Sequence, residues 1–472
     1  MDFNSSSPFP EGVISFLDTD LYKLTMQCAV FKCFPDVEVT YAYTNRTPDK
    51  KLSRAAFRWL EKQIQKLGNI SLSAEEYRYL VENCDYLTPD YVDFLKEFHL
   101  HPREQVSISF HPVGGTDTGS DDQLGDTDIS IKGKWVETIL YEIPILALTS
   151  EAYFKFMDTD WDYEGQEEAA FDKGLRLFEA GCVTSEFGTR RRRDYHTQAL
   201  VFRGLVRAAD KAKEQGHTVG RLSGTSNVHL AMRFNIPPVG TVAHEWFMGT
   251  AAVIGDYRAA TEEALCRWVS VFGPKLSIAL TDTFGTPEFL KAFSKPVQAV
   301  EDGKGGTYPV EKLTQADGSA KTYAELFAGV RQDSGDPEEF VRVMRKYYDS
   351  EGIDPSGKTI VFSDSLNIDR CLLYKKAAEA EGFNPTFGVG TFLTNDFTHR
   401  KTGTKSVPLN IVIKLSSAAG RPAIKISDNI GKNTGDKDLV AQVKKQLGYV
   451  ENEWADGDET SRWGKESDKA KA

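Results

Sequence analysis

The sequence predicts an α/β protein built around a parallel sheet, as a closed or nearly closed barrel or, alternatively, a doubly wound open sheet. Short apolar runs end abruptly in small or polar residues and lead into helix-like segments. The pattern repeats at intervals of roughly 20 to 50 residues, which is typical of parallel α/β structure. The runs cover residues 181–187, 219–226, 239–244, 276–282, 329–333, 359–364 and 385–390. About seven such units favour the barrel.

The same repeat predicts the place of a functional site. Helices are expected over residues 337–348 and 367–381, each after one of the runs. Because the C-terminal ends of parallel strands lie at one edge of a sheet, the residues that end the runs should converge there. These residues are Ser226, His244, Asp282, Asp333, Asp364 and Gly390.

Four regions are expected along the chain: an N-terminal α/β domain, a barrel domain, a C-terminal segment packing back on the N-terminal domain, and a disordered tail. Their expected bounds are 1–150, 151–400, 401–457 and 458–472.

Within the first region, alternation predicts a strand at 37–43, and further patterns predict a helix after Ser53 and a strand at 106–110. The polar, Gly- and Asp-rich stretch 114–128 predicts a mobile surface loop.

Composition narrows the classes of protein. The chain has 472 residues, a net charge of -12 and six cysteines without metal-ligand spacing, which indicates reduced thiols. Its first ten residues lack a basic start and an apolar stretch, and no apolar run is long enough to span a bilayer. We therefore expect a cytoplasmic protein, with the nucleus as a second location, and no membrane or nucleic-acid partner.

Four consecutive arginines, Arg190 to Arg193, follow the aromatic Phe187 in this acidic chain. Like charges so close together repel one another unless negatively charged groups neutralise them. Three interpretations stay open at this point: a solvated turn paired with nearby acids, a nucleic-acid or nuclear-import patch, and a site for a small anion with a flat ring.

Two further stretches carry candidate site residues. Arg331 and Asp333 lie two apart at a strand end and should share a face, while Asp336 is expected to cap the helix that Pro337 opens. Residues 352–359 match the P-loop pattern, but a helical run precedes them and a strand follows. A P-loop has the reverse order, so we interpret this stretch as a helix-to-strand turn.

A glycine-rich strand end and a histidine complete the candidates. Gly388 and Gly390 let backbone amides approach a phosphate closely, and Thr391 follows them. His244 is expected at a strand tip beside Glu245, whose carboxylate could fix the histidine tautomer and prepare the ring as a phosphoryl acceptor or general base.

Taken in order, these segments resemble the nicotinate phosphoribosyltransferase family and suggest its fungal form. The stretches that carry the resemblance are residues 17–26, 137–144, 186–191, 224–227, 240–246, 331–336, 362–367 and 424–429. They are spread over most of the chain, and several are long enough to be specific.

The resemblance implies a type II phosphoribosyltransferase with an incomplete, irregular parallel α/β barrel, an N-terminal α/β domain, and a homodimer with shared active sites. The implied reaction joins nicotinate to 5-phosphoribosyl-1-diphosphate (PRPP), giving nicotinate mononucleotide and diphosphate, as the first step of NAD salvage from nicotinate. ATP would be a co-substrate, and its hydrolysis would drive the reaction, which is of the ligase type. Mg²⁺ is expected with the PRPP diphosphate, because no side-chain motif for a metal is present.

The resemblance also implies the residues that bind nicotinate. Phe187 would stack on one face of the pyridine ring, and Tyr22 from the second subunit on the other. Arg331 and Thr241 would bind the carboxylate. Ser226 would select nicotinate, because nicotinamide-using relatives carry an aspartate there, whose charge would repel a carboxylate.

The remaining implied roles concern phosphate, ribose and ATP. Arg190 would face a phosphate, with assistance from Arg191, while Arg192 and Arg193 would pair with local carboxylates such as Asp194 or with the partner subunit. Asp333 and Asp364 would meet the ribose. The 5-phosphate would be bound by Gly388, Gly390 and Thr391. His244 would be phosphorylated by ATP, with Glu245 and Asp333 as its catalytic companions.

Other functions stay open from the sequence. A nicotinamide- or quinolinate-using enzyme of the same fold is one alternative, and a non-catalytic protein that binds NAD metabolites or nucleic acid is another. A barrel glycosidase using Asp333 and Asp364 is a third, opposed by the lack of an aromatic-lined sugar cleft.

Overall fold

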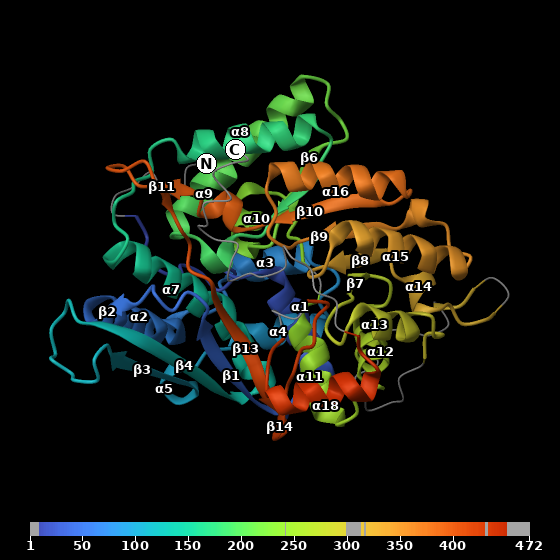
Figure 1. Cartoon of the computed structure of the whole chain (residues 1–472), viewed down its shortest axis with the longest axis horizontal. Helices are drawn as coiled ribbons and strands as arrows, with labels where there is room; N and C mark the ends of the chain where they lie inside the picture. Colours follow the sequence, from blue (N-terminus) through green and yellow to red (C-terminus); the bar gives the residue numbers. More distant parts are fainter. Residues whose placement is uncertain (1–8, 241, 299–312, 316–317, 430–432, 451–472) are drawn as a thin grey trace.

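Two six-stranded sheets organise the computed structural model, one antiparallel and one parallel (Figure 1). The structure describes residues 9–240, 242–298, 313–315, 318–429 and 433–450. Within these residues, no helix combines the length and the apolar character needed to cross a membrane.

The antiparallel sheet belongs mainly to the N-terminal part of the chain. Its strands run in the order β14-β13-β1-β4-β2, with β3 also paired to β4. The elements of this part are α1 (Leu21–Cys33), β1 (Glu38–Asn45), β2 (Leu52–Ser53), α2 (Arg54–Lys66), α3 (Ala74–Asn83), α4 (Pro89–Glu97), α5 (Pro102–Gln105), β3 (Val106–Pro112), β4 (Leu124–Lys134), α6 (Trp135–Thr138) and α7 (Glu142–Phe156).

Local chemistry explains where these elements begin. The Ser53 side chain accepts from Ala56 N and caps α2, so the predicted helix after Ser53 is confirmed. The strands predicted at 37–43 and 106–110 are confirmed as β1 and β3.

The loop predicted over 114–128 is too long. Residues 124–128 belong to β4, which pairs with β3 through Pro112↔Gly125 and Phe110↔Thr127. Alternate residues of β4 face the core, and Ile129 and Ile131 are buried, so the sheet takes up residues whose polar sequence suggested a loop.

The parallel sheet has the order β6-β5-β10-β9-β8-β7, and each described pairing in it is parallel. Its elements are α8 (Gln166–Glu179), β5 (Val183–Glu186), α9 (Tyr195–Glu214), β6 (Arg221–Thr225), α10 (Val228–Phe234), α11 (His244–Ile254), α12 (Ala260–Phe272), β7 (Ile278–Leu280), α13 (Thr286–Phe293), α14 (Tyr323–Leu326), β8 (Gly329–Gln332), α15 (Pro337–Ser350), β9 (Thr359–Phe362), α16 (Ile368–Ala380), β10 (Asn384–Val389) and α17 (Thr391–Thr394). In the described part of the chain β6 and β7 end the sheet, so the barrel is incomplete, as the resemblance implies.

The strand predicted at 239–244 is wrong. Among the described residues, this stretch forms only a bridge between Thr225 and Pro238, with Val239 N donating to Thr225 O at 2.9 Å, before α11 begins at His244. Gly240 has a φ of +148°, which takes the chain out of the strand conformation. His244 therefore opens a helix instead of ending a strand.

The other predictions for this region are confirmed. Helices α15 and α16 cover the two predicted helices, and the Asp336 carboxylate caps α15 by accepting from the amides of Glu338 and Glu339. The P-loop-like stretch 352–359 is the turn from α15 to β9, so its glycines and lysine do not precede a helix.

The chain after residue 400 returns to the N-terminal sheet. Strand β13 (Ile411–Ala418) pairs antiparallel with β1, and Figure 1 draws it in orange-red along that strand. The other elements here are β11 (Phe397–Thr398), β12 (Lys405–Ser406), β14 (Arg421–Pro422) and α18 (Lys437–Leu447). The tail predicted over 458–472 lies outside the described residues.

A buried carboxyl group on α7 gives a testable pH dependence. Burial first, and then Asp194, raises the pKa of Glu151 from 4.5 to about 8. Because the folded protein holds this proton more tightly than the unfolded chain, the free energy of unfolding should fall as pH rises from about 4.5 to about 8 and level off above. Urea unfolding at several pH values measures the fall, and Glu151→Gln should be less steep than the wild type. Equal slopes for the two proteins would contradict the assignment.

Candidate active site

One pocket of about 240 Å³ lies where the C-terminal ends of the parallel strands face the N-terminal sheet. Most of the predicted site residues line it. They are Tyr22, Phe187, Arg190, His244, Glu245, Arg331, Asp333, Asp364, Gly388, Gly390 and Thr391. The predicted convergence is thus confirmed for Asp333, Asp364 and Gly390 at strand ends, and for His244 at the start of a helix. Asp282 lies beside them, 3.6 Å from the His244 ring.

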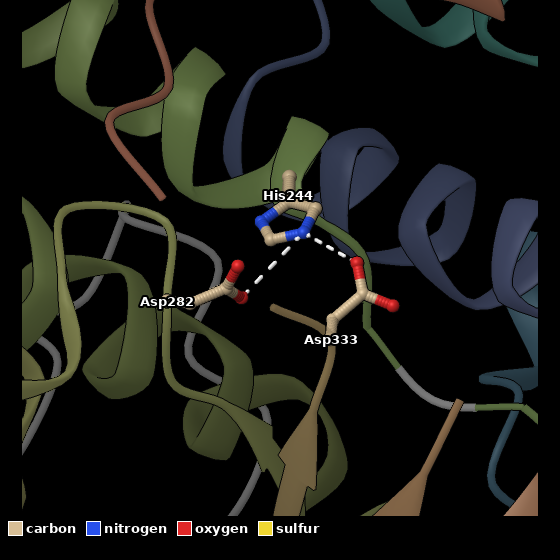
Figure 2. Close-up of side chains that lie close together, drawn as sticks. All are labelled: His244, Asp282 and Asp333. Carbon is tan, nitrogen blue, oxygen red and sulfur yellow. Dashed lines mark hydrogen bonds and ion pairs between the residues drawn. The ribbon is translucent and has the colours of Figure 1, made fainter. Parts of the chain in front are cut away.

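The His244 ring lies among groups from several strand ends (Figure 2). Its Nε2 is 3.0 Å from Asp333 Oδ2 and 3.6 Å from Asp282 Oδ1. Its Nδ1 is 3.0 Å from Thr283 Oγ1. These contacts fix the ring plane at the pocket wall.

A lysine from the C-terminal segment reaches the same ring. Lys425 Nζ lies 2.8 Å from His244 Nε2 and 3.4 Å from Asp282 Oδ2. Burial first, and then the Lys425 charge, lowers the pKa of His244, so its imidazole is neutral at neutral pH. A neutral ring keeps a lone pair, as a nucleophile requires.

The residues around His244 form a potential metal cluster. Ligand atoms of His244, Asp282 and Asp333 all lie within 4.8 Å of one another. However, the Lys425 ammonium already contacts two of these groups and balances their negative charge. Mg²⁺ prefers oxygen ligands in an octahedron and keeps several waters, so this cluster does not fit it.

Asp333 links the strand ends of β8 and β9 to the histidine. Its Oδ1 accepts from Arg331 Nη2 at 2.9 Å and from Ser363 Oγ at 2.9 Å. Although burial opposes ionisation, the Arg331 guanidinium and His244 hold the pKa of Asp333 well below its usual range. Arg331 also donates to Ser363 Oγ at 2.8 Å, so its guanidinium is oriented before any ligand arrives.

The structure corrects the expected contact between Glu245 and His244. Among the described residues, the Glu245 carboxylate contacts Lys23, Tyr41 and Trp135 and does not contact His244. Successive residues of an α-helix point about 100° apart, so Glu245 faces away from the ring beside it. The ring is fixed by Thr283, Asp333 and Lys425 instead.

The Phe187 ring packs directly against the backbone of Gly388, where no side chain would fit. A Cβ atom on Gly388 would come within 2.3 Å of the Phe187 ring. Phe187 N also donates to Val389 O at 2.8 Å, which ties β5 to β10 beneath the ring. Gly388 therefore supports the aromatic side chain, in addition to any role toward phosphate.

The strand end after Gly388 forms the short helix α17. Gly390 precedes Thr391, the first residue of α17, and a Cβ on Gly390 would lie 3.2 Å from the Phe187 carbonyl oxygen. Lys173 donates to Phe392 O at 2.8 Å and pairs with Asp396, which anchors the far end of this turn.

Two arginines of the run, Arg190 and Arg191, line the pocket. Arg191 donates to Asn410 Oδ1 at 2.9 Å, whereas the Arg190 side chain has no hydrogen bond or salt bridge to the described residues. Burial opposes the charge of Arg190, but Tyr22 and Glu142 lead the groups that keep its pKa above the ordinary value. A guanidinium in this state is ready to bind an anion.

The expected pairing of Arg192 and Arg193 with the neighbouring Asp194 is replaced by contacts with distant residues, and both side chains are fully buried. Arg192 donates to both oxygens of Asp18 at 2.7 and 2.8 Å. Arg193 lies 3.9 Å from the ring centres of Phe154 and Phe397. Their roles are structural, and Asp194 instead caps α9 by accepting from Thr197 N.

Three further predicted nicotinate residues have different outcomes. Thr241 lies outside the described residues. Ser226 does not line the pocket, because it is buried and donates to Asp20 Oδ1 at 2.7 Å. Tyr22 lines the pocket formed within its own chain, and the contribution expected from a second subunit stays a prediction.

The sequence did not single out several charged groups of the pocket. Arg46, Glu142, Lys414 and Lys425 line it, from the N-terminal part and the C-terminal segment. For Glu142 and Lys425 a signal existed, since both lie in stretches that carry the resemblance. For the others, no local pattern marks their direction.

Comparisons with known proteins agree with this geometry. Residues 182–451 match the model of the "Nicotinate phosphoribosyltransferase (NAPRTase) family" and residues 17–150 match its N-terminal domain. The "Probable nicotinate phosphoribosyltransferase" of Schizosaccharomyces pombe is 47% identical over 92% of this chain and 98% of its own. The "Nicotinate phosphoribosyltransferase" of Saccharomyces cerevisiae is 43% identical over 95% and 98%.

Solved structures give the same result. The crystal structure of a putative nicotinate phosphoribosyltransferase from Saccharomyces cerevisiae has a TM-score of 0.84 and 42% identity, covering 93% of this chain and 100% of its own. A nicotinate phosphoribosyltransferase from Porphyromonas gingivalis has a TM-score of 0.76 and 32% identity, covering 92% and 99%.

Proposed function

The chain belongs to the nicotinate phosphoribosyltransferase family, and from this premise we propose that it joins nicotinate to PRPP with ATP as a co-substrate. The products are nicotinate mononucleotide and diphosphate. One observation supports the proposal most strongly: a single pocket gathers an aromatic ring, Phe187, a guanidinium, Arg190, and a neutral imidazole, His244. The aromatic ring can stack on a flat base, the guanidinium can bind the phosphate of a phosphorylated sugar, and the imidazole can accept a phosphoryl group.

In the transfer step the nicotinate ring nitrogen attacks the anomeric carbon of PRPP, and the bond from that carbon to the diphosphate oxygen breaks. Stacking on Phe187 orients the ring nitrogen, and the Arg331 guanidinium attracts the carboxylate. Positive charge develops on the ribose, next to the carboxylates of Asp333 and Asp364. Mg²⁺ bound with the PRPP diphosphate would neutralise the charge of the leaving group.

In the ATP step His244 attacks the terminal phosphorus of ATP. A nitrogen–phosphorus bond forms, the bond to the bridging oxygen breaks, and ADP leaves with the electron pair. The neutral ring supplies the lone pair, and Lys425 lies next to it as a countercharge. Water later cleaves the phosphohistidine, so that the free energy of ATP hydrolysis can open and close the site.

Selectivity for nicotinate over nicotinamide is proposed to act through Ser226 and its neighbour. The Ser226 hydroxyl donates to the buried Asp20. Burial raises the pKa of Asp20 and the charge of Arg190 opposes this rise, so Asp20 and Arg190 interact electrostatically. A second carboxylate in place of Ser226 would repel Asp20 and weaken the positive potential that Arg190 offers an acid.

The proposal is tested by product formation from nicotinate and from nicotinamide, each with PRPP and with or without ATP. We expect the mononucleotide from nicotinate, faster with ATP, and little from nicotinamide. Faster turnover of nicotinamide or of quinolinate would assign another substrate. Absence of any mononucleotide would favour a binding protein, for which tight binding of an NAD metabolite without turnover is the positive sign.

Gly388→Ala is expected to weaken nicotinate binding by displacing Phe187. The new methyl group would overlap the ring at 2.3 Å, so the ring must leave its present position. Loss of one stacking face corresponds to about 1–3 kcal/mol, or roughly a fivefold to 150-fold rise in KM for nicotinate.

The control for this prediction is Gly357→Ala, because a Cβ on Gly357 meets nothing within 4 Å. Its KM should equal that of the wild type. An unchanged KM in Gly388→Ala would mean that Phe187 does not stack on the base.

A further inference from the structure

The carboxylate of Glu245 is bound by three donors from the N-terminal part of the chain. Lys23 Nζ of α1 contacts Oε2, Tyr41 OH of β1 donates to Oε1 at 2.6 Å, and Trp135 Nε1 of α6 donates to Oε1 at 2.8 Å. Glu245 itself belongs to the first turn of α11, in the barrel part. The side chain thus connects two parts of the chain that are far apart in sequence.

These groups are removed from water. Lys23 and Trp135 are 0% exposed and Tyr41 is 2% exposed. Burial alone would lower the pKa of Lys23, but the charges of Glu142 and Glu245 hold it above its ordinary value. A buried charge without partners costs free energy of folding. Each donor removed from Glu245 therefore weakens the attachment of α11 to the N-terminal part of the chain.

Close packing fixes the same helix a second time. A Cβ on Gly249, one turn after Glu245, would lie 2.1 Å from Trp135 Cη2. The indole therefore rests against the helix backbone while its N–H donates to Glu245. Helix α11 can neither slide nor rotate without losing one of these contacts.

His244, the residue before Glu245, is fixed from the opposite side. Its ring contacts Thr283 and Asp333 at the strand ends and Lys425 of the C-terminal segment. Neighbouring residues at the start of one helix are therefore bound by the two halves of the structure. A small rotation of the first turn would move the imidazole relative to Asp333.

We propose that Glu245 is a positioning residue, which couples the N-terminal domain to the reactive ring by fixing the first turn of α11. Lys23, Tyr41 and Trp135 are the groups through which the domain acts. The expected effect on reaction rate rests on the proposed function, because the affected step is the phosphorylation of His244. Its structural content, the fixed first turn, stands independently of any reaction.

The test compares Tyr41→Phe with Tyr91→Phe. Both remove one buried tyrosine hydroxyl from the N-terminal domain, but Tyr91 donates to Gln27 Oε1 at 2.8 Å instead of to Glu245. Tyr41→Phe is expected to lower the maximal rate of ATP-dependent phosphohistidine formation about tenfold, with KM for ATP within twofold. Tyr91→Phe should keep the wild-type rate at a similar loss of thermal stability.

Hydrogen exchange of the backbone amides of residues 245–248 gives the readout that needs no activity. Exchange should be faster in Tyr41→Phe than in the wild type and unchanged in Tyr91→Phe. Gly249→Ala, which pushes α11 away from Trp135, should reproduce both effects of Tyr41→Phe.

Equal exchange rates in this segment for the two tyrosine variants would overturn the proposal, and so would equal phosphorylation rates. A wild-type protein that forms no phosphohistidine would sink the proposed ATP step alone, and the exchange comparison would still decide the role of Glu245.

Discussion

His244→Ala is expected to abolish ATP-dependent phosphorylation and the stimulation of transfer by ATP, while slow transfer continues at high substrate concentrations. Without the imidazole, no other described pocket residue offers a neutral nitrogen nucleophile to ATP. Phe187, Arg190 and Asp364 are untouched, so binding and orientation of nicotinate and PRPP persist. The loss in ATP-coupled rate should be on the order of a hundredfold or more.

The measurement follows ADP release and mononucleotide formation in the same reaction, with acid-labile, base-stable phosphate on the protein as the direct assay. His229→Ala is the matched control, because His229 is buried away from the pocket and bonds Ser15 and Tyr195. That variant should lose stability but keep the coupling. Continued ATP stimulation in His244→Ala would move the phosphoryl acceptor elsewhere.

The sequence predicted most of the pocket because its residues end strands. Once the parallel repeat was found, the positions of Asp333, Asp364 and Gly390 followed from topology, and the structure places all three in the lining of the pocket. The direction of a side chain inside a helix follows from different geometry. Residues 239–244 resembled a strand, so Glu245 was expected beside the His244 ring, whereas helix α11 turns it toward the N-terminal domain.

Burial of charge was the second difficulty. Four adjacent arginines suggested solvent, since local repulsion is visible in the sequence and distant partners are not. Arg192 meets Asp18, which is 174 residues away, and Arg193 lies between rings of Phe154 and Phe397. Lys425 likewise reaches His244 across 181 residues. Such pairs depend on tertiary contacts that no local pattern encodes.

Asp333→Asn is expected to slow both phosphorylation and transfer by about a hundredfold to a thousandfold, because its charge serves several groups at once. The carboxylate accepts from Arg331 and Ser363 through Oδ1 and faces His244 through Oδ2. An amide of the same shape offers one acceptor atom and no charge. The Arg331 guanidinium would then be left without its countercharge.

Loss of that charge acts on the reaction in two ways. The developing positive charge on the ribose loses an adjacent anion, and the Arg331 guanidinium becomes free to rotate away from the position in which it awaits the nicotinate carboxylate. We therefore expect kcat to fall and KM for nicotinate to rise in the same variant. Phosphohistidine formation should slow as well, because the ring loses one of the contacts that fix it.

Asp336→Asn is the control, since Asp336 lies three residues further along and caps α15, a role that asparagine performs about equally well. Its rates should match those of the wild type, and thermal melting of both variants separates unfolding from loss of chemistry. If Asp333→Asn keeps a third or more of the wild-type kcat at unchanged KM, the negative charge is dispensable. The role of Asp333 would then reduce to holding Arg331 and Ser363 in place through neutral hydrogen bonds.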